Sequence, residues 1–313
     1  MEDTISVNSQ HKYFETNYDK EFTINNYRFL LVEKELNLSG TIPDGVMGLG
    51  IDTEGNINNS FVYSLYKQNK IKEASFSFYL ASTRDTSRLY FGDILENKYI
   101  QQFLGASTHF CNVPYYSHYW QCKVDNGVTL YHKGSALHFN TNANVIFDTG
   151  SSYTIIPSED FLTIMSYYKS LGEQCKLNTI YQMQCMCSSP EQFDVIQMKF
   201  SSGAQYNITL NEMIDYYPYE RYQCHFQIIV DVFGLNIWLL GDSALRATLI
   251  TFNMNTKQIK WVQTKNRFDE MQLADSAMVN AHDKLFASFN WMNWLIYITI
   301  ALCIIGIVYY FIR

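Results

Sequence analysis

The chain has 313 residues, of which 47% are hydrophobic and 16% aromatic, so it is long enough for one large domain or two lobes with ordinary cores. Its 23 Lys and Arg residues against 30 Asp and Glu residues give a formal net charge of −7, and no basic cluster suited to phosphates is present. Nucleic acid is therefore not expected as a partner.

Short runs rich in Val, Ile, Thr, Tyr and Phe predict a β-rich body rather than long helices. Two helices are expected, at residues 59–70 and 158–172, and Ser158 is expected to cap the second one through its hydroxyl. Strands and tight turns are expected at residues 27–36, 41–51, 75–82, 87–94, 109–124, 144–150, 193–202, 206–210, 224–232, 237–242 and 247–263.

The C-terminal segment contains no charged residue between Lys284 and Arg313. Residues 294–312 give 19 apolar-rich positions, close to the ~20 that a transmembrane helix needs. Aromatic residues that suit the two membrane interfaces flank them, namely Trp291, Trp294, Tyr309 and Tyr310. We therefore predict a transmembrane helix at 291–313 after a polar helical stalk at 268–290, with a buried core helix as the alternative.

The basic residue Arg313 follows the predicted span, which favours a cytosolic C-terminus. The body would then be lumenal or extracellular, at the cell surface or in an endomembrane or acidic vesicle. Three N-x-[ST] sequons are compatible with glycosylation there, at Asn37, Asn58 and Asn207. Residues 1–14 show no apolar region of the signal-peptide type, so a natural start upstream of Met1 or an unusual targeting route is expected.

Six of the 7 cysteines lie in the body, and this even number favours disulfide bonds; they are Cys111, Cys122, Cys175, Cys185, Cys187 and Cys224. A bond between Cys111 and Cys122 would cross-link a hairpin. Six cysteines leave the full connectivity open. Zinc is the alternative use, but the C-x-C spacing at Cys185 and Cys187 lacks the usual two to four intervening residues. No metal site or cofactor is therefore expected.

A single carboxylate, Asp148, stands in the turn Asp148-Thr149-Gly150-Ser151-Ser152 after an apolar strand. Gly150 permits positive φ or close approach of another group, and backbone N–H groups with Ser or Thr hydroxyls would keep a carboxylate ionised. By itself the motif favours an ordinary turn over a functional site, because Asp, Thr and Gly are common turn residues.

The surrounding motifs resemble those of the pepsin-like aspartic proteases. "VIFDTGSSYTIIP" is similar to the second active-site loop of that family, and "IWLLGDSALRATLITFNMNTKQIKWV" to its closing segment, in which Leu239-Leu240-Gly241 packs beside the catalytic loop. "PDGVMGLGI", "SFSFYLASTRDTSRLYFGDI" and "VPYYSHYWQCKV" resemble intervening landmarks in the same order. The resemblance covers about residues 1–264.

The resemblance implies an all-β, bilobal body with the rest of an N-terminal lobe at residues 1–104 and a C-terminal lobe at 105–267. It implies a polypeptide substrate, no cofactor and a monomer. Asp148 would be catalytic, with Thr149, Gly150, Ser151 and Ser152 supporting its loop. Asp242 would anchor a turn, and the family's second-lobe disulfide would join Cys224 to Cys185 or Cys187.

The sequence departs from the family pattern because a second D-[TS]-G is absent. The nearest candidates all lack the glycine, namely Asp3-Thr4-Ile5, Asp52-Thr53-Glu54 and Asp85-Thr86-Ser87. Hydrolysis in this family needs two carboxylates that share a proton. We therefore expect that the first catalytic loop precedes Met1, that the N-terminal lobe is incomplete, and that this chain alone is inactive.

Two other hypotheses remain open at this point. The chain could be a non-catalytic, membrane-anchored relative that binds peptides or glycans in the cleft. Alternatively, Asp148 from two copies could meet across a twofold axis, as in retroviral-type homodimers, although most of two lobes is already present in one chain.

Overall fold

The computed structural model describes residues 2–7, 22–28, 46–51, 60–80, 87–96, 108–141, 143–217, 223–246 and 248–263. The predicted stalk at 268–290, the predicted transmembrane helix at 291–313 and the sequons at Asn37 and Asn58 lie outside these ranges. Within these ranges no helix is long and apolar enough to cross a membrane.

The described chain is mostly strand, with three short α-helices. The helices are α1 (Phe61–Lys67), α3 (Ser158–Ser170) and α4 (Asp242–Leu245). The strands are β1 (Glu2–Val7), β2 (Phe22–Arg28), β3 (Ser75–Tyr79), β4 (Arg88–Phe91), β5 (His109–Asn112), β6 (Gln121–His132), β7 (Ser135–Phe139), β8 (Asn144–Phe147), β9 (Thr154–Ile156), β10 (Cys175–Leu177), β11 (Gln182–Met186), β12 (Val195–Phe200), β13 (Gln205–Thr209), β14 (Ile214–Tyr217), β15 (Gln223–Val230), β16 (Ile237–Leu240), β17 (Thr248–Asn253) and β18 (Gln258–Gln263).

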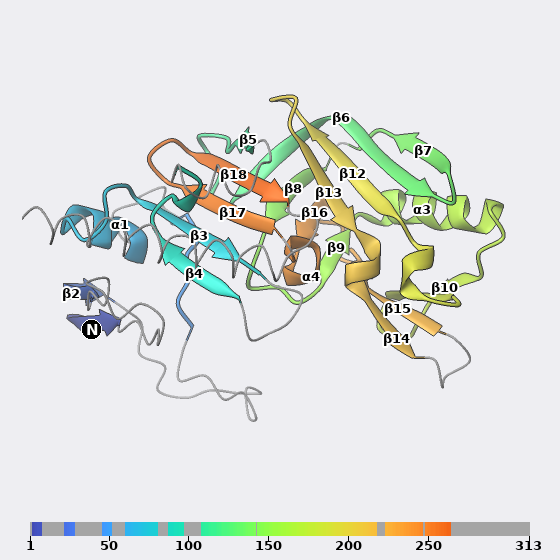
Figure 1. Ribbon diagram of the computed structural model, residues 1–313, viewed down its shortest axis with the longest axis horizontal. Coiled ribbons are helices and arrows are strands. Elements are labelled where there is room, and N and C mark those ends of the chain that lie inside the picture. The colour runs from blue at the N-terminus through green and yellow to red at the C-terminus, as the bar shows by residue number, and fades with distance from the viewer. Residues whose placement is uncertain are drawn as a thin grey trace, which may run out of the picture.

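These strands form three sheets. An 11-stranded sheet runs in the order β10-β11-β15-β9-β16-β8-β6-β12-β13, with β14 and β7 as side strands on β15 and β6. A five-stranded sheet has the order β4-β3-β17-β18-β5, and β1 pairs with β2. Figure 1 shows the five-stranded sheet toward the left of the molecule and α3 at the right.

The five-stranded sheet joins segments from both expected lobes. Strand β17 pairs antiparallel with β3, so that Phe252 lies opposite Phe76 and their rings stack at 4.9 Å. Trp120 packs against both rings, at 5.8 and 5.2 Å. Burial of these large aromatic side chains is the main driving force for holding the two parts of the chain together.

Within the described residues most expected elements are confirmed, with two corrections, whereas the expected segment at 27–36 lies mostly, and that at 41–51 partly, outside the described residues. Ser158 is the first residue of α3 and not its N-cap; the cap position is Pro157, and no side-chain hydrogen bond caps the helix. The expected strand at 109–124 is interrupted between β5 and β6. Pro114 lies in this interruption, and a strand is not continued there because proline has no N–H to donate to the ladder. The Pro114 carbonyl instead accepts a turn hydrogen bond from Ser117 N–H.

All six body cysteines form disulfide bonds. Cys111 bonds to Cys122, as the sequence suggested, and closes the turn between β5 and β6. Of the two alternatives for Cys224, the structure forms the bond to Cys187. Cys185 bonds instead to Cys175, a pair that the sequence did not single out.

Helix α3 is tied to the sheet through a buried carboxylate. Asp160 is 7% exposed, and its Oδ2 accepts hydrogen bonds at 2.6 Å from both Trp238 Nε1 on β16 and the Thr141 hydroxyl. Since Trp238 is fully buried, its indole N–H has no access to water if this acceptor is removed.

We expect Asp160→Ala to lower the free energy of unfolding by about 2–3 kcal/mol, because a buried donor loses its acceptor. The neighbouring Glu159 is exposed, and Glu159→Ala should change stability by less than about 0.5 kcal/mol. Urea unfolding of both variants checks this difference. Equal stability losses would show that the contact to Trp238 contributes little.

A second buried carboxylate, Glu173, joins the end of α3 to the β6–β7 turn. Its Oε1 accepts from His132 Nε2 at 3.0 Å and pairs with Lys133 Nζ, and its Oε2 accepts from Gln192 Nε2 at 2.7 Å. Although burial raises the pKa of Glu173, the hydrogen bonds from Lys133 and His132 outweigh burial and hold the pKa below its usual value.

Because the folded-state pKa is lowered, ionised Glu173 stabilises the fold above the ordinary glutamate pKa of ~4.3, and this contribution disappears as the pH falls through the folded-state pKa. We expect Glu173→Gln to lower the free energy of unfolding by about 1–2 kcal/mol at neutral pH, with the deficit shrinking in acid. Denaturation at several pH values tests this, with exposed Glu159→Gln as the control. A pH-independent deficit would contradict it.

Candidate active site

The candidate site is built on β8, whose last residue is Phe147. Phe147 is 3% exposed and its ring contacts those of Tyr206 at 5.5 Å, Trp261 at 5.9 Å and Phe200 at 6.1 Å. The aromatic contacts fix the end of the strand, so that the next residue, Asp148, leaves the core at a defined position and is half-buried.

The carboxylate of Asp148 is held by its own turn. Gly150 N–H donates to Oδ1 at 2.9 Å, and the Ser151 hydroxyl donates to Oδ2 at 2.7 Å. Each oxygen therefore has one donor, an arrangement that fixes the plane of the carboxylate. A Cβ on Gly150 would lie 3.1 Å from Oδ1, so the glycine lets the backbone approach the carboxylate closely.

The position of the loop is fixed by β16, which lies between β8 and β9 in the sheet. Strand β16 pairs parallel with β8 and antiparallel with β9 at Leu239 and Ile155. The loop exchanges backbone hydrogen bonds with the end of β16, from Asp148 N–H to Leu240 O at 3.0 Å, and with the start of α4, from Asp242 N–H to Ser151 O at 2.7 Å. The turn is therefore fixed at both ends by main-chain contacts.

Gly241 makes this close approach possible. A Cβ at this position would lie 2.3 Å from Tyr153 O and 2.6 Å from Ser151 O, well inside van der Waals contact. The resemblance placed Leu239-Leu240-Gly241 beside the catalytic loop, but the reason for the glycine is a packing contact with residues about ninety positions earlier in the chain, which the sequence does not reveal.

The other predicted site residues lie in or beside the same turn. Thr149 is half-buried, while Gly150 and Ser152 are exposed. Asp242 begins α4, and its Oδ2 lies 3.7 Å from Arg246 Nη2. Its backbone N–H, rather than its carboxylate, contacts the Asp148 loop, in keeping with the turn-anchoring role that the resemblance implied.

The nearest sequence candidates for a second carboxylate are Asp3, Asp52 and Asp85. Asp3 lies in β1, and Asp52 and Asp85 fall outside the described residues. In the part of the chain that is described, no group of three or more His, Cys, Asp or Glu residues is arranged to hold a metal ion.

Comparison with known proteins identifies related sequences. The family model "Eukaryotic aspartyl protease" matches residues 13–264. The aspartic-type endopeptidase ctsD of Aspergillus fumigatus is 24% identical over 221 residues, covering 69% of this chain and 43% of the relative. Aspartic protease 3 of Toxoplasma gondii is 27% identical over 165 residues, covering 50% and 24%, and aspartic proteinase sxa1 of Schizosaccharomyces pombe is 23% identical over 222 residues, covering 64% and 39%. The chain thus spans less than half the length of each of these relatives.

Among solved structures, the aspartic proteinase from Irpex lacteus superposes with a TM-score of 0.59 at 15% identity, covering 78% of this chain and 74% of that one. This likeness shows a mostly β, pepsin-like fold. The family match covers residues 13–264 of the 313, and this chain therefore belongs to the eukaryotic aspartyl protease family.

Proposed function

We propose that the protein is an aspartic-type endopeptidase in which Asp148 is one of two catalytic carboxylates. Two facing carboxylates cannot both ionise, so they share one proton and hold a water molecule between them. One carboxylate takes a proton from the water as it attacks the scissile carbonyl, and the protonated one donates a hydrogen bond to the carbonyl oxygen. The substrate class is a polypeptide.

The observation that carries this proposal is the doubly hydrogen-bonded carboxylate of Asp148 in a loop fixed by β16. A carboxylate with one donor on each oxygen is oriented rather than free to rotate, and precise orientation of a reacting group supplies much of an enzyme's rate enhancement. Support also comes from the family match and from the relatives named as aspartic endopeptidases.

The second carboxylate of the proposed site comes from outside these 313 residues, since they contain one D-[TS]-G motif. The test compares peptide cleavage at acidic pH by the 313-residue chain alone and by the protein isolated from its natural source. We expect cleavage only by the isolated protein. Cleavage by the chain alone would overturn the need for an external carboxylate, and no cleavage by either would favour a non-catalytic peptide- or glycan-binding role.

Ser151 should contribute to activity through its hydrogen bond to Asp148 Oδ2. In the active protein, we expect Ser151→Ala to lower kcat/KM by about 10- to 100-fold, which corresponds to loss of one charge-assisted hydrogen bond. Ser152 is exposed, so Ser152→Ala is the matched control and should leave kcat/KM nearly unchanged. Equal effects of the two substitutions would contradict a specific role for Ser151.

The proposed cellular context follows from the sequence. The apolar segment 291–313 would anchor a monomeric protein in a membrane by a single span, with the body in the lumen or outside the cell. Three disulfide bonds agree with an oxidising compartment. Asn207, in a sequon, lies half-buried on β13 with its Oδ1 bonded to Gln197 Nε2 at 3.0 Å. Protease protection of the body in sealed microsomes, with loss of protection after detergent, tests the topology.

A further inference from the structure

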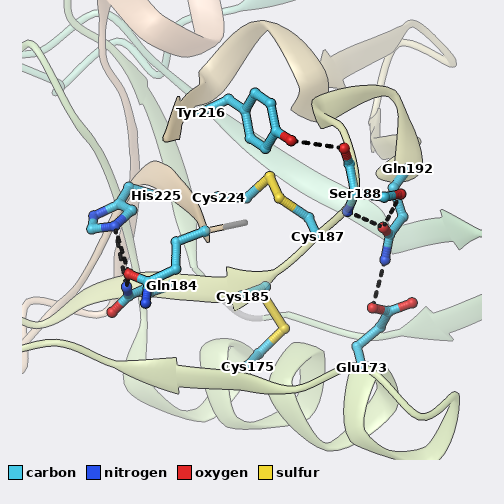
Figure 2. Close-up of a disulfide and its surroundings, with 11 residues drawn as sticks. Glu173, Cys175, Gln184, Cys185, Cys187, Ser188, Gln192, Tyr216, Cys224 and His225 are labelled. Carbon is cyan, nitrogen blue, oxygen red and sulfur yellow. Dashed lines mark hydrogen bonds between the residues drawn. A yellow bond between two sulfur atoms is a disulfide. The ribbon is translucent and has the colours of Figure 1, made fainter. Parts of the chain in front are cut away.

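Four cysteines gather on one face of the three strands β10, β11 and β15. Cys175 lies directly opposite Cys185 across the β10–β11 pair, and Cys185 lies directly opposite Cys224 across the β11–β15 pair. Residues that face each other on neighbouring strands point to the same side of the sheet. Cys187 follows β11 directly, two residues after Cys185, and its bond to Cys224 brings it to the same group. Figure 2 shows the two disulfides one above the other.

The Cys187–Cys224 disulfide does not join residues that lie directly opposite each other across the β11–β15 pair. Cys224 faces Cys185 across the ladder, yet it is bonded to Cys187, with a Cα–Cα distance of 5.9 Å. Directly opposite residues of antiparallel strands have Cα atoms about 4.5–5.5 Å apart, which is within the range that a disulfide spans. Cys185 can therefore bond to Cys224 without any change of strand register.

The four cysteine residues differ in their exposure to solvent. Cys175 is half-buried and, with Cys185, borders a cavity of about 380 Å³ that is also lined by Gln174, Lys176, Gln184, Met186 and Gln223. Cys185 and Cys224 are 1% and 0% exposed. Cys187 is 5% exposed and borders a second cavity with Met186, Ser188 and Gln192. A thiol that enters from solvent thus meets Cys175 first.

We propose that this face is a thiol-exchange site that accepts a small peptide thiol and passes the exchange from the Cys175–Cys185 bond to the Cys187–Cys224 bond. The incoming thiolate attacks Cys175 Sγ, which breaks the Cys175–Cys185 bond, forms a mixed disulfide at Cys175 and leaves Cys185 as a thiolate. Cys185 then attacks Cys224 Sγ, which forms a Cys185–Cys224 bond and releases Cys187 as a thiolate. One thiolate is consumed and one, on Cys187, is formed, so the two steps involve no net oxidation or reduction.

The cavity beside Cys175 determines the class of thiol. Its lining offers three amide side chains and the ammonium group of Lys176, groups that hydrogen-bond to peptide amides and attract carboxylates. A small thiol with peptide bonds and carboxylates therefore fits the site better than a simple alkyl thiol.

The exchange has a structural consequence near the candidate active site. It moves the cross-link to β15 by two residues, from Cys187, which follows β11, to Cys185 within β11. Strand β15 pairs in parallel with β9, where Val230 lies opposite Ile156, and β9 follows directly on the loop of Asp148. The cross-link thus acts on the strand that supports this loop, although the exchange chemistry itself does not depend on peptidase activity.

The test uses the full 313-residue chain and reduced glutathione as the probe. After incubation, free thiols are trapped with N-ethylmaleimide, and cyanogen bromide cleavage after Met183 and Met186 places Cys175, Cys185 and Cys187 in three different fragments. We expect glutathione on Cys175, maleimide on Cys187, and a new Cys185–Cys224 cross-link, with the Cys111–Cys122 bond intact as an internal control. Maleimide on Cys185 with the Cys187–Cys224 bond retained, equal reduction of all three bonds, or no reaction would each overturn the proposal.

A variant isolates the second step without an added thiol. In Cys187→Ser, Cys224 becomes a free thiol opposite Cys185, and we expect it to displace Cys175, so that maleimide labels Cys175 rather than Cys224 after rapid acid quenching and denaturation. Labelling of Cys224 would overturn the exchange between β11 and β15. Recognition is tested with 2-mercaptoethanol at equal thiolate concentration, and a rate equal to that of glutathione would overturn the peptide-thiol class.

Discussion

Replacement of Asp148 by asparagine should abolish peptide cleavage by the active protein while the fold is preserved. Asparagine has the same shape and can keep hydrogen bonds to Gly150 N–H and the Ser151 hydroxyl, but it can neither remove a proton from water nor share a proton with a second carboxylate. Loss of one general acid/base alone lowers rates by about 10²- to 10⁴-fold, and groups that act as a unit lose nearly all of their joint effect together. We therefore expect kcat/KM to fall by about 10⁴-fold or more.

The control for this substitution is Asp242→Asn. Asp242 lies next to the same loop, and its carboxylate makes a long, partly exposed contact with Arg246 at 3.7 Å, which contributes little to stability. This variant should keep most of the activity, and both variants should unfold at denaturant concentrations close to that of the wild type. Comparable losses of activity in the two variants would show that Asp148 has no special role.

The Asp148→Asn variant also distinguishes two hypotheses about the second carboxylate. It comes either from another segment of the same protein or from a second copy of this chain. If two copies each supplied Asp148, activity would rise with the square of the chain concentration at low concentration, and added variant chain would inhibit the wild type by forming mixed dimers. We expect activity that is linear in concentration and unaffected by the variant chain, because one copy already contributes most of two lobes. Inhibition by the variant would instead support the homodimer.

Two of the expected strands show a regular alternation of burial. In β12 and β15, half-buried and buried positions alternate without interruption along the whole strand, and both strands were expected. Strands β10 and β11 were missed because β10 has three residues and β11 buries the polar Gln182 and Gln184 among apolar neighbours. Partners distant from each residue along the chain satisfy these amides, for example the 3.1 Å contact of Gln184 with His225, and no local pattern reveals such partners.

The candidate site was predictable in its residues but not in its geometry. The D-T-G-S-S motif singled out Asp148 and its neighbours, and the structure adds the specific role of Ser151 as donor to one carboxylate oxygen. Two adjacent serines follow the glycine, and only the conformation of the turn decides that Ser151 reaches the carboxylate while Ser152 is exposed. Likewise, the C-x-C at Cys185 and Cys187 left the pairing open, and the structure bonds Cys185 to Cys175 and Cys187 to Cys224.

Among glycine-to-alanine substitutions, which add a single methyl group, the largest loss of stability is expected at Gly241. Gly241→Ala would place a Cβ 2.3 Å from Tyr153 O and 2.6 Å from Ser151 O. Both obstacles are backbone atoms, and the loop is joined to the end of β16 by the hydrogen bond from Asp148 N–H to Leu240 O and to the start of α4 by that from Asp242 N–H to Ser151 O. Neither side can move away without breaking these bonds, so the cost should reach the upper end of the overpacking range, about 3 kcal/mol or more.

Gly241→Ala should also impair activity beyond its effect on the folded fraction, because any relief of the clash displaces the loop that orients Asp148, and misplacement by about 1 Å can lower a rate 10²-fold. Gly50→Ala is the matched control, since Gly50 is exposed and no described atom lies within 4 Å of a Cβ there. Urea unfolding and kcat/KM of the two variants, measured under conditions in which both are folded, separate stability from positioning. A Gly241→Ala variant as stable and active as the Gly50→Ala control would show that the backbone contact between the loop and β16 is not the element that holds the catalytic aspartate in place.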